Sequence, residues 1–430
     1  MQDSSKISLL RRWYRVMYPL LHTIWEYGVL PIAFFGLCIE YPILVIRHIR
    51  TVKKATYIYP LFFGSFGHQG VDLHMLAMRF RNKNLLVLLS DYGNYNPYII
   101  DSFAPYVAVR ILRHSHFAAC TWKRVFTAER LRTIKRVLLH IICAVTGSHA
   151  VVLEEFCSQR GEQVTGSYIN EYISLLQQHS DIHISPPTAA VEQFWSALEI
   201  LSPGASHRWF VSLYLRRKRG KYPDVRDTSP LPYRASIERI LADGGLVLIG
   251  GDYDPHVLFP DLRGVFGYKD LPCSREIADV GMLSQCQFFI GGHSGPLVIA
   301  TAFNVPALIS NNAFFYLSGY RENQRVLWKK LRRMSSRQIL STQETFTLPI
   351  VAFIENEPFK AAGLQHVDNT EQEILAATNE MLLLVNGSLT YTSEDDVLEQ
   401  KFRHLLPPNA VAALSPCKPV RSYIQGLHLS

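Results

Sequence analysis

Residues 288–297, in the second half of the chain, constrain the fold most strongly. They read FFIGGHSGPL: an apolar run breaks into two glycines, a small polar step and a proline that opens a helical pattern. This order is typical of a buried parallel strand that turns directly into a helix, with Pro296 at the first helical position and Ser294 or Gly295 as the cap. Such a turn points unpaired backbone N–H groups outward at the positive end of the helix dipole. It therefore predicts an anion site, most often a phosphate site in enzymes, although it is also compatible with a tight turn that binds nothing.

Short apolar runs alternate with helical patterns on both sides of a seam at residues 201–204. The expected strands are residues 55–63, 85–89, 151–153, 209–215, 246–249, 288–290 and 307–309. This alternation predicts an α/β protein with two Rossmann-like, doubly wound domains facing a cleft. The expected divisions are an apolar and basic N-terminal segment (1–55), a first domain (56–195), a second domain (205–385), and a terminal helix with a loose tail (386–430).

The amino-acid composition limits the classes of molecule that the protein is expected to bind. The chain has 430 residues, of which 48% are hydrophobic and 19% charged, so it is long and apolar enough for two folded domains. A formal net charge of +8 favours an anionic partner. Nucleic acid is not expected, because no zinc-finger or helix-turn-helix spacing is visible. The seven cysteines form no C-x-x-C pair, which favours reduced thiols in the cytoplasm over a zinc site or a disulfide framework.

The N-terminal segment is apolar and aromatic over residues 13–46, with basic residues on both sides. Its longest uncharged run, residues 27–39, is short for a transmembrane helix, and no signal-peptide cleavage pattern follows it. The pattern fits a segment that lies on the inner face of the cytoplasmic membrane, and equally a helical pair that packs on the protein itself. Basic residues over 321–337 are interpreted as a helix whose charged face contacts solvent, or else a lipid-linked diphosphate or an anionic membrane.

The second region carries a series of motifs: WFVSLYLR at 209–216, DVRD at 224–227, GGLVLIGGD at 244–252, FIGGHSGP at 289–296 and VPA at 305–307. In order and spacing they resemble the GT-B glycosyltransferases, most closely a bacterial surface-carbohydrate family of that fold. The turn at Gly67-His68 resembles that family's acceptor-side loop. One departure is Tyr214, where the family often has a histidine, so a role for that histidine does not carry over.

The resemblance implies transfer of a sugar from a nucleotide donor, without a metal or other cofactor, during synthesis of lipopolysaccharide, capsule or a similar glycan. Residues 56–195 would then form the acceptor domain and residues 205–385 the nucleotide-sugar domain.

The cations next to the expected strands are the candidate ligands of a diphosphate. Arg216 is the first charged residue after an apolar strand, and a guanidinium binds phosphate in a bidentate way. Arg226 is a similar candidate, unless it pairs with a neighbouring aspartate in its loop. Backbone N–H groups of Gly292, Ser294 and Gly295 are expected to contact the diphosphate, and the ring of His293 to add a donor.

Three further residues are candidates on chemical grounds. Inverting transfer needs a base for the acceptor hydroxyl, and His68 fits that task. Asp72, one helical turn later, could orient His68 or be the base itself, although both residues could simply solvate the start of a helix. Asp252 is expected to contact the donor. An alternative is that Asp252 and Asp254 hold a divalent metal, as Asp-x-Asp does in the other large glycosyltransferase fold.

The sequence therefore predicts an inverting glycosyltransferase that needs no metal. Fixed positive groups, namely Arg216 and the turn at residues 292–295, would stabilise the charge of the leaving nucleoside diphosphate. Two alternatives remain open. One is a nucleotide-sugar 2-epimerase of the same fold, which would act on the donor without an acceptor; the other is a non-catalytic scaffold at the membrane.

Overall fold

The computed structural model describes the following parts of the chain: residues 43, 57–61, 66–81, 84–91, 95–113, 143–144, 147–150, 167–182, 184–216, 225–352, 356–406 and 410–425. The chain divides into two compact units. Unit 1 comprises Met1–Gly64, Asn82–Tyr95 and Val107–Val152, and unit 2 comprises Ser65–Arg81, Asn96–Tyr106 and Leu153–Ser430.

Unit 1 contains a parallel sheet of four strands in the order β3-β2-β1-β4. Its strands are β1 (Tyr57–Leu61), β2 (Leu85–Asp91), β3 (Ala108–Arg113) and β4 (His149–Ala150). The expected strands at 55–63 and 85–89 are confirmed by β1 and β2, whereas the one expected at 151–153 lies outside the described residues.

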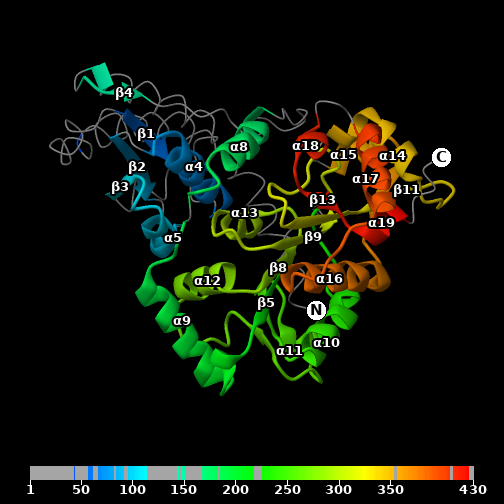
Figure 1. Ribbon diagram of the computed structural model, residues 1–430, viewed down its shortest axis with the longest axis horizontal. Helices are drawn as coiled ribbons and strands as arrows, with labels where there is room; N and C mark the ends of the chain where they lie inside the picture. The colour runs from blue at the N-terminus through cyan, green and yellow to red at the C-terminus, as the bar shows by residue number, and fades with distance from the viewer. Residues whose placement is uncertain are drawn as a thin grey trace, which may run out of the picture. The chain divides into compact units, whose positions relative to one another are not determined.

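Unit 2 contains a sheet of seven strands in the order β13-β10-β9-β8-β5-β6-β7, and every pairing in it is parallel (Figure 1). The strands are β5 (Phe210–Leu215), β6 (Leu246–Gly251), β7 (Val265–Gly267), β8 (Phe288–Gly291), β9 (Ala307–Asn312), β10 (Gln324–Trp328) and β13 (Lys418–Pro419). The chain runs outward from β5 through β6 to β7, then returns to the other side of β5 and continues through β8 to β10. The topological switch point of this doubly wound sheet therefore lies between β5 and β8.

Helices connect the strands, which confirms the expected α/β class with parallel sheets. The longer ones are α4 (Phe66–Arg79), α8 (Ser167–Gln178), α9 (Thr188–Leu201), α10 (Arg234–Ala242), α12 (Arg275–Ser284), α13 (Gly295–Ala302), α16 (Glu371–Val385) and α17 (Ser393–Leu405). The shorter ones are α5 (Pro97–Ser102), α11 (Pro255–Leu258), α14 (Thr342–Thr347), α15 (Asn356–Ala361), α18 (Val411–Leu414) and α19 (Arg421–Gln425).

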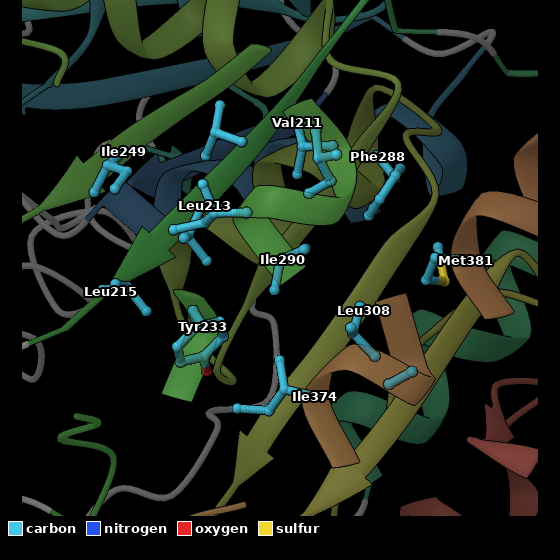
Figure 2. Packing of buried hydrophobic residues seen from close by; sticks show 14 of the residues in the cluster. Val211, Leu213, Leu215, Tyr233, Ile249, Phe288, Ile290, Leu308, Ile374 and Met381 are labelled. Atoms are coloured by element: carbon cyan, nitrogen blue, oxygen red, sulfur yellow. The ribbon is translucent and has the colours of Figure 1, made fainter. Parts of the chain in front are cut away.

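One face of the seven-stranded sheet packs against α10 and α16. Side chains at alternate positions of β5, Val211, Leu213 and Leu215, are buried against apolar residues of these helices. Figure 2 shows this cluster, in which Ile290 and Leu308 of the neighbouring strands lie in the same layer as Ile374 of α16. Burial of each such side chain contributes about 1.5–3 kcal/mol to the stability of the fold. The cluster therefore fixes the strands whose ends form the edge described below.

The opposite face packs against α9 and α12. Phe210 of β5 contacts Phe194 of α9, with ring centroids 5.6 Å apart. Gly281 of α12 lets the two helices approach, since a Cβ atom there would lie 2.0 Å from the Phe194 ring. Gly70 of α4 similarly packs against Ile299 of α13, whose Cδ1 atom would lie 2.2 Å from an added Cβ. The second contact places α4 directly beside the helix that follows β8.

The helix expected over residues 321–337 is wrong. The structure has β10 there, followed by β11 (Lys330–Arg333), which pairs antiparallel with β12 (Leu364–Val367). Arg325 is 2% exposed and its Nε lies 3.0 Å from Glu380, while Lys329 is 3% exposed and bonds Asp368 at 2.8 Å. Arg325 and Lys329 are therefore buried in ion pairs and do not form part of a solvated helix face. Because their acidic partners lie far along the chain, no local sequence pattern indicates these pairs.

The described part of the C-terminal region contains further helices and a strand. The helix α17 falls within residues 386–430, and β13 adds an edge strand to the main sheet beside β10. The N-terminal segment at residues 13–46 lies almost wholly outside the described residues. Within the part of the chain that is described, no helix is long and apolar enough to cross a bilayer. Four cysteines there, Cys143, Cys273, Cys286 and Cys417, are free thiols.

Candidate functional site

The candidate site lies where β5 and β8 end side by side. The last paired residues of these parallel strands are Tyr214 and Gly291. Arg216 follows β5 directly, and residues 292–295 follow β8 directly, so both leave the sheet at the same edge. This edge is at the switch point, where open α/β sheets form a crevice for ligands at the carboxyl ends of their strands.

The turn after β8 has the expected strand-to-helix form. Ser294 is the N-cap of α13 with extended backbone angles, and Pro296 lies in the first turn. The Ser294 hydroxyl donates to the carbonyl of Gly292 at 3.1 Å and does not cap the helix, so no side chain of the turn accepts from the first N–H groups of α13. These groups, at the positive end of the helix dipole, are chemically suited to an anion.

The two glycines of the turn have different surroundings. A Cβ atom on Gly291 would meet the Phe289 ring at 2.8 Å and the Tyr214 carbonyl at 2.9 Å, so packing alone requires glycine there. A Cβ atom on Gly292 would meet nothing nearer than the Ser310 carbonyl oxygen at 3.8 Å. Packing within the protein therefore does not explain Gly292, whereas the close approach of a ligand would.

His293 is directed into the protein. It is 9% exposed, and its Nε2 lies 3.2 Å from the Tyr320 hydroxyl. Burial lowers the pKa of His293 to about 4; the charge of Arg226 also lowers it, and a hydrogen bond to the backbone of Ser318 acts in the opposite direction. The ring is therefore neutral at pH 7 and engaged on its inner side, so it supports the turn rather than adding a positive charge to it.

Arg226 lies close to the same turn. Its Cζ atom is 5.8 Å from the centroid of the Phe314 ring, which in turn contacts His293. The loop that carries Arg226 is tied to the end of β5, because the Thr228 N–H donates to the Arg216 carbonyl at 3.3 Å. The structure thus brings Arg216, Arg226 and the turn after β8 together.

Asp252 and Asp254 follow β6, the neighbour of β5 on the other side. Asp252 is exposed, and its N–H donates to the Leu215 carbonyl at 3.4 Å. Asp254 caps the short helix α11 by accepting from the His256 N–H at 3.0 Å. Across the described ranges, no group of three or more His, Cys, Asp or Glu residues is placed to hold a metal ion. The observed role of Asp254 is thus that of a helix cap.

A charged cluster around Tyr214 is not recognisable from the sequence. Burial raises the pKa of the Tyr214 hydroxyl, as do the charges of Asp279 and Asp252, while Arg275 and Arg216 lower it. Asp279, on α12, has its pKa raised to about 6 by burial, despite Arg275 nearby. The spacing of Arg275 and Asp279 at i and i+4 is visible in the sequence, but their effect on Tyr214 depends on how α12 packs on the sheet.

His68 and Asp72 lie one turn apart in α4, as predicted. The side chain of His68 lies outside the described residues. Asp72 is partly buried and accepts a hydrogen bond from the Tyr168 hydroxyl of α8 at 2.5 Å. No local pattern reveals this partner, which is distant in the sequence. The role of either residue as a base stays a prediction.

Comparisons with known proteins give structural matches alone. No family model matches the chain, and no curated protein matches it by sequence. The structure is similar to a glycosyl transferase of family 9 from Veillonella parvula, at 12% identity and a TM-score of 0.45, covering 76% of this chain and 97% of that one. It is also similar to the E. coli ADP-heptose lps heptosyltransferase II, at 12% identity and a TM-score of 0.43, covering 77% and 100% of the two chains. Both matched structures are named as a glycosyl transferase or a heptosyltransferase, and both are matched at low sequence identity.

Proposed function

We propose that this protein is a glycosyltransferase that moves a sugar from a nucleotide-sugar donor to a surface-glycan or lipid-linked acceptor, without a metal. One observation carries the proposal: Arg216 and the glycine turn that opens α13 leave adjacent parallel strands at the topological switch point of the sheet. A guanidinium beside free backbone N–H groups at a helix start suits a diphosphate, the leaving group of such a transfer.

The proposed roles follow from these positions. Backbone N–H groups of Gly292, Ser294 and Gly295 contact the diphosphate, and Arg216 neutralises the charge that develops on it as the sugar departs. Arg226 adds a second positive charge, and Asp252 contacts the donor from the end of β6. His293 holds the turn from its inner side. Because these groups are fixed before the reaction, they stabilise the transition state without reorganisation.

The acceptor side of the proposal rests on α4. His68 or Asp72 removes the proton of the acceptor hydroxyl, with Tyr168 holding Asp72 in place. The proposal is completed by residues 56–195 as the acceptor domain, residues 205–385 as the donor domain, and membrane contact through residues 13–46. The contribution of residues 386–430, with α17 and β13, is structural.

A thermal-shift screen tests the donor site. Purified protein is heated with ADP, UDP, GDP or CMP and with the corresponding nucleotide sugars, with and without a chelator. We expect one nucleotide to raise the Tm by mass action, and the chelator to leave that rise unchanged. No rise with any nucleotide would favour the scaffold alternative, and a rise that requires manganese would favour metal binding at Asp252 and Asp254.

The variant Gly292→Ala tests whether the ligand binds at the glycine turn. Since its Cβ atom has room, the variant should keep the Tm of the free protein yet lose most of the ligand-induced rise. Gly291→Ala is the contrasting variant, and it should lower the Tm of the free protein itself. Incubation of the selected nucleotide sugar alone, followed by NMR, separates transfer from epimerisation, because only an epimerase converts the donor without an acceptor.

A further inference from the structure

The neutral ring of His293 has an unusual set of neighbours for a residue in a ligand-binding turn. Its Nε2 faces the Tyr320 hydroxyl at 3.2 Å, and its ring lies edge-on to Tyr320 and to Phe314, with centroids 5.5 Å and 5.7 Å away. Tyr320 is 2% exposed, so its hydroxyl is shielded from water. In such surroundings a hydrogen bond restricts geometry strongly, because breaking it leaves two buried polar atoms unpaired.

Tyr320 is itself anchored at the far end of α13. Its N–H donates to the side-chain oxygen of Gln324 at 2.7 Å, and the amide of Gln324 donates to the Thr301 hydroxyl at 2.8 Å. Arg321, the next residue, donates to the Thr301 carbonyl at 3.1 Å. Thr301 is in the last turn of α13, whereas His293 precedes its first turn. Tyr320 therefore connects the two ends of one helix.

The ring of Tyr320 also contacts helix α8. Tyr172 packs edge-on against it with centroids 5.3 Å apart, and the Tyr172 hydroxyl lies 2.9 Å from Nδ1 of His74 in α4. All three side chains are buried, at 0–2% exposure. Tyr320 thus has little freedom to move away from His293.

We propose that Tyr320 is a positioning residue for the diphosphate-binding turn, because its hydroxyl holds His293 and its backbone is anchored through Gln324 to the other end of α13. This inference rests on the proposed function. Tyr320 is buried and acts on the ligand only through His293. It keeps the backbone N–H groups of residues 292–295 in the orientation that an anion requires, so that less ordering remains to be done on binding.

The test is the affinity of the nucleoside diphosphate selected by the thermal-shift screen, measured by isothermal titration. Tyr320→Phe removes one hydroxyl and keeps the ring, and we expect it to weaken the Kd by about tenfold. Tyr391→Phe is the matched control, since it also removes a partly buried hydroxyl, one that donates to Glu380 at 3.1 Å far along the chain. It should lower stability without changing the Kd.

A double-mutant cycle distinguishes positioning from a general loss of packing. If Tyr320 acts through His293, then Tyr320→Phe should add little to the loss caused by His293→Leu. His293→Gln, whose amide can still accept from the Tyr320 hydroxyl, should retain more affinity than His293→Leu. Additive losses, or equal affinity of Tyr320→Phe and wild type, would overturn the inference and leave the proposed function intact.

If the wild-type protein binds no nucleoside diphosphate, that result would overturn both the inference about Tyr320 and the proposed function. Should Tyr320→Phe fold poorly, NMR of the wild-type histidine nitrogens gives a second measurement. Diphosphate binding should shift the resonance of His293 Nε2, while a purely structural bond would leave it unchanged.

Discussion

Arg216 has its place because β5 ends one residue before it, beside the last residue of β8. Its carbonyl also accepts from Thr228, which ties the Arg226 loop to the same edge of the sheet. Two cations that are separated in the sequence by a run of further basic residues thereby lie near one helix start. The sequence indicated Arg216 because the first charge after an apolar strand lies at the carboxyl edge, and it indicated Arg226 as a similar cation in the loop that follows.

Replacing Arg216 tests the charge at this edge. Arg216→Ala should weaken binding of the selected nucleoside diphosphate by about tenfold to a hundredfold, because it removes a charge-assisted hydrogen bond. Arg263→Ala is the control, since this exposed arginine precedes β7 at the opposite edge of the sheet. Isothermal titration measures both, and wild-type affinity in Arg216→Ala would remove that residue from the site.

The burial of His366 is expected to lower the stability of the protein. Both of its ring nitrogens are buried without a hydrogen-bond partner, and its ring lies against Phe315 and Phe359. His366→Leu should raise the free energy of unfolding by about 1 kcal/mol in urea titrations at pH 7, because no buried nitrogen is then left unpaired. The exposed His404 serves as the control for the same change, with an expected effect close to zero. A clear loss of stability in His366→Leu would show that the nitrogens have partners in solution.

At the scale of elements, close packing decides which helices touch. The sequence predicted strands β5, β6, β8 and β9 well, because short buried apolar runs between glycine turns are a strong local signal. It failed over β10 and β11, where basic residues at mixed spacings were interpreted as a helix. Buried Arg325 and Lys329 pair with Glu380 and Asp368, which come from much later in the chain, so no local pattern could reveal these ion pairs.

The contact of α12 with α9 provides a test at this scale. Gly281→Ala should lower the free energy of unfolding by about 1–3 kcal/mol, because the new methyl group would overlap the Phe194 ring. Ser284→Ala, in the last turn of the same helix, adds no atoms and removes the hydroxyl that donates to the Val280 carbonyl, so it should lower the free energy of unfolding by no more than about 1 kcal/mol. Chemical denaturation of both variants measures the difference. Equal stability would mean that α9 and α12 have room to move apart.

At the scale of the whole molecule, buried neutral histidines link stability to pH. Burial lowers the pKa of His74 to about 3, of His293 to about 4 and of His366 to about 3, from an ordinary value of 6.5. Between pH 6.5 and about 4 the unfolded chain therefore binds protons that the folded state does not. The pKa of Asp279 is raised to about 6, so its contribution to stability changes with pH in the opposite direction and offsets that of one of the three histidines.

We therefore expect the free energy of unfolding to fall as the pH is lowered from 6.5 towards 4. Each of the three histidines contributes up to about 1.4 kcal/mol per pH unit. Urea titrations at pH 7.5, 6.0 and 5.0 measure the slope, and a stability that stays level or rises on acidification would contradict the assignment. Asp279→Asn should make the fall steeper, since it removes the opposing contribution.

The sequence by itself determined the α/β class, the parallel strands and the glycine turn before α13, because these depend on local apolar runs, glycine and proline. It also singled out Arg216, Arg226 and the turn at residues 292–295. The tertiary structure alone decided that the Tyr320 hydroxyl contacts His293 and that Asp279 lies near Tyr214. It also decided that Arg325 and Lys329 are buried. Those arrangements join segments distant along the chain, and only the packing of helices on the sheet brings such segments together.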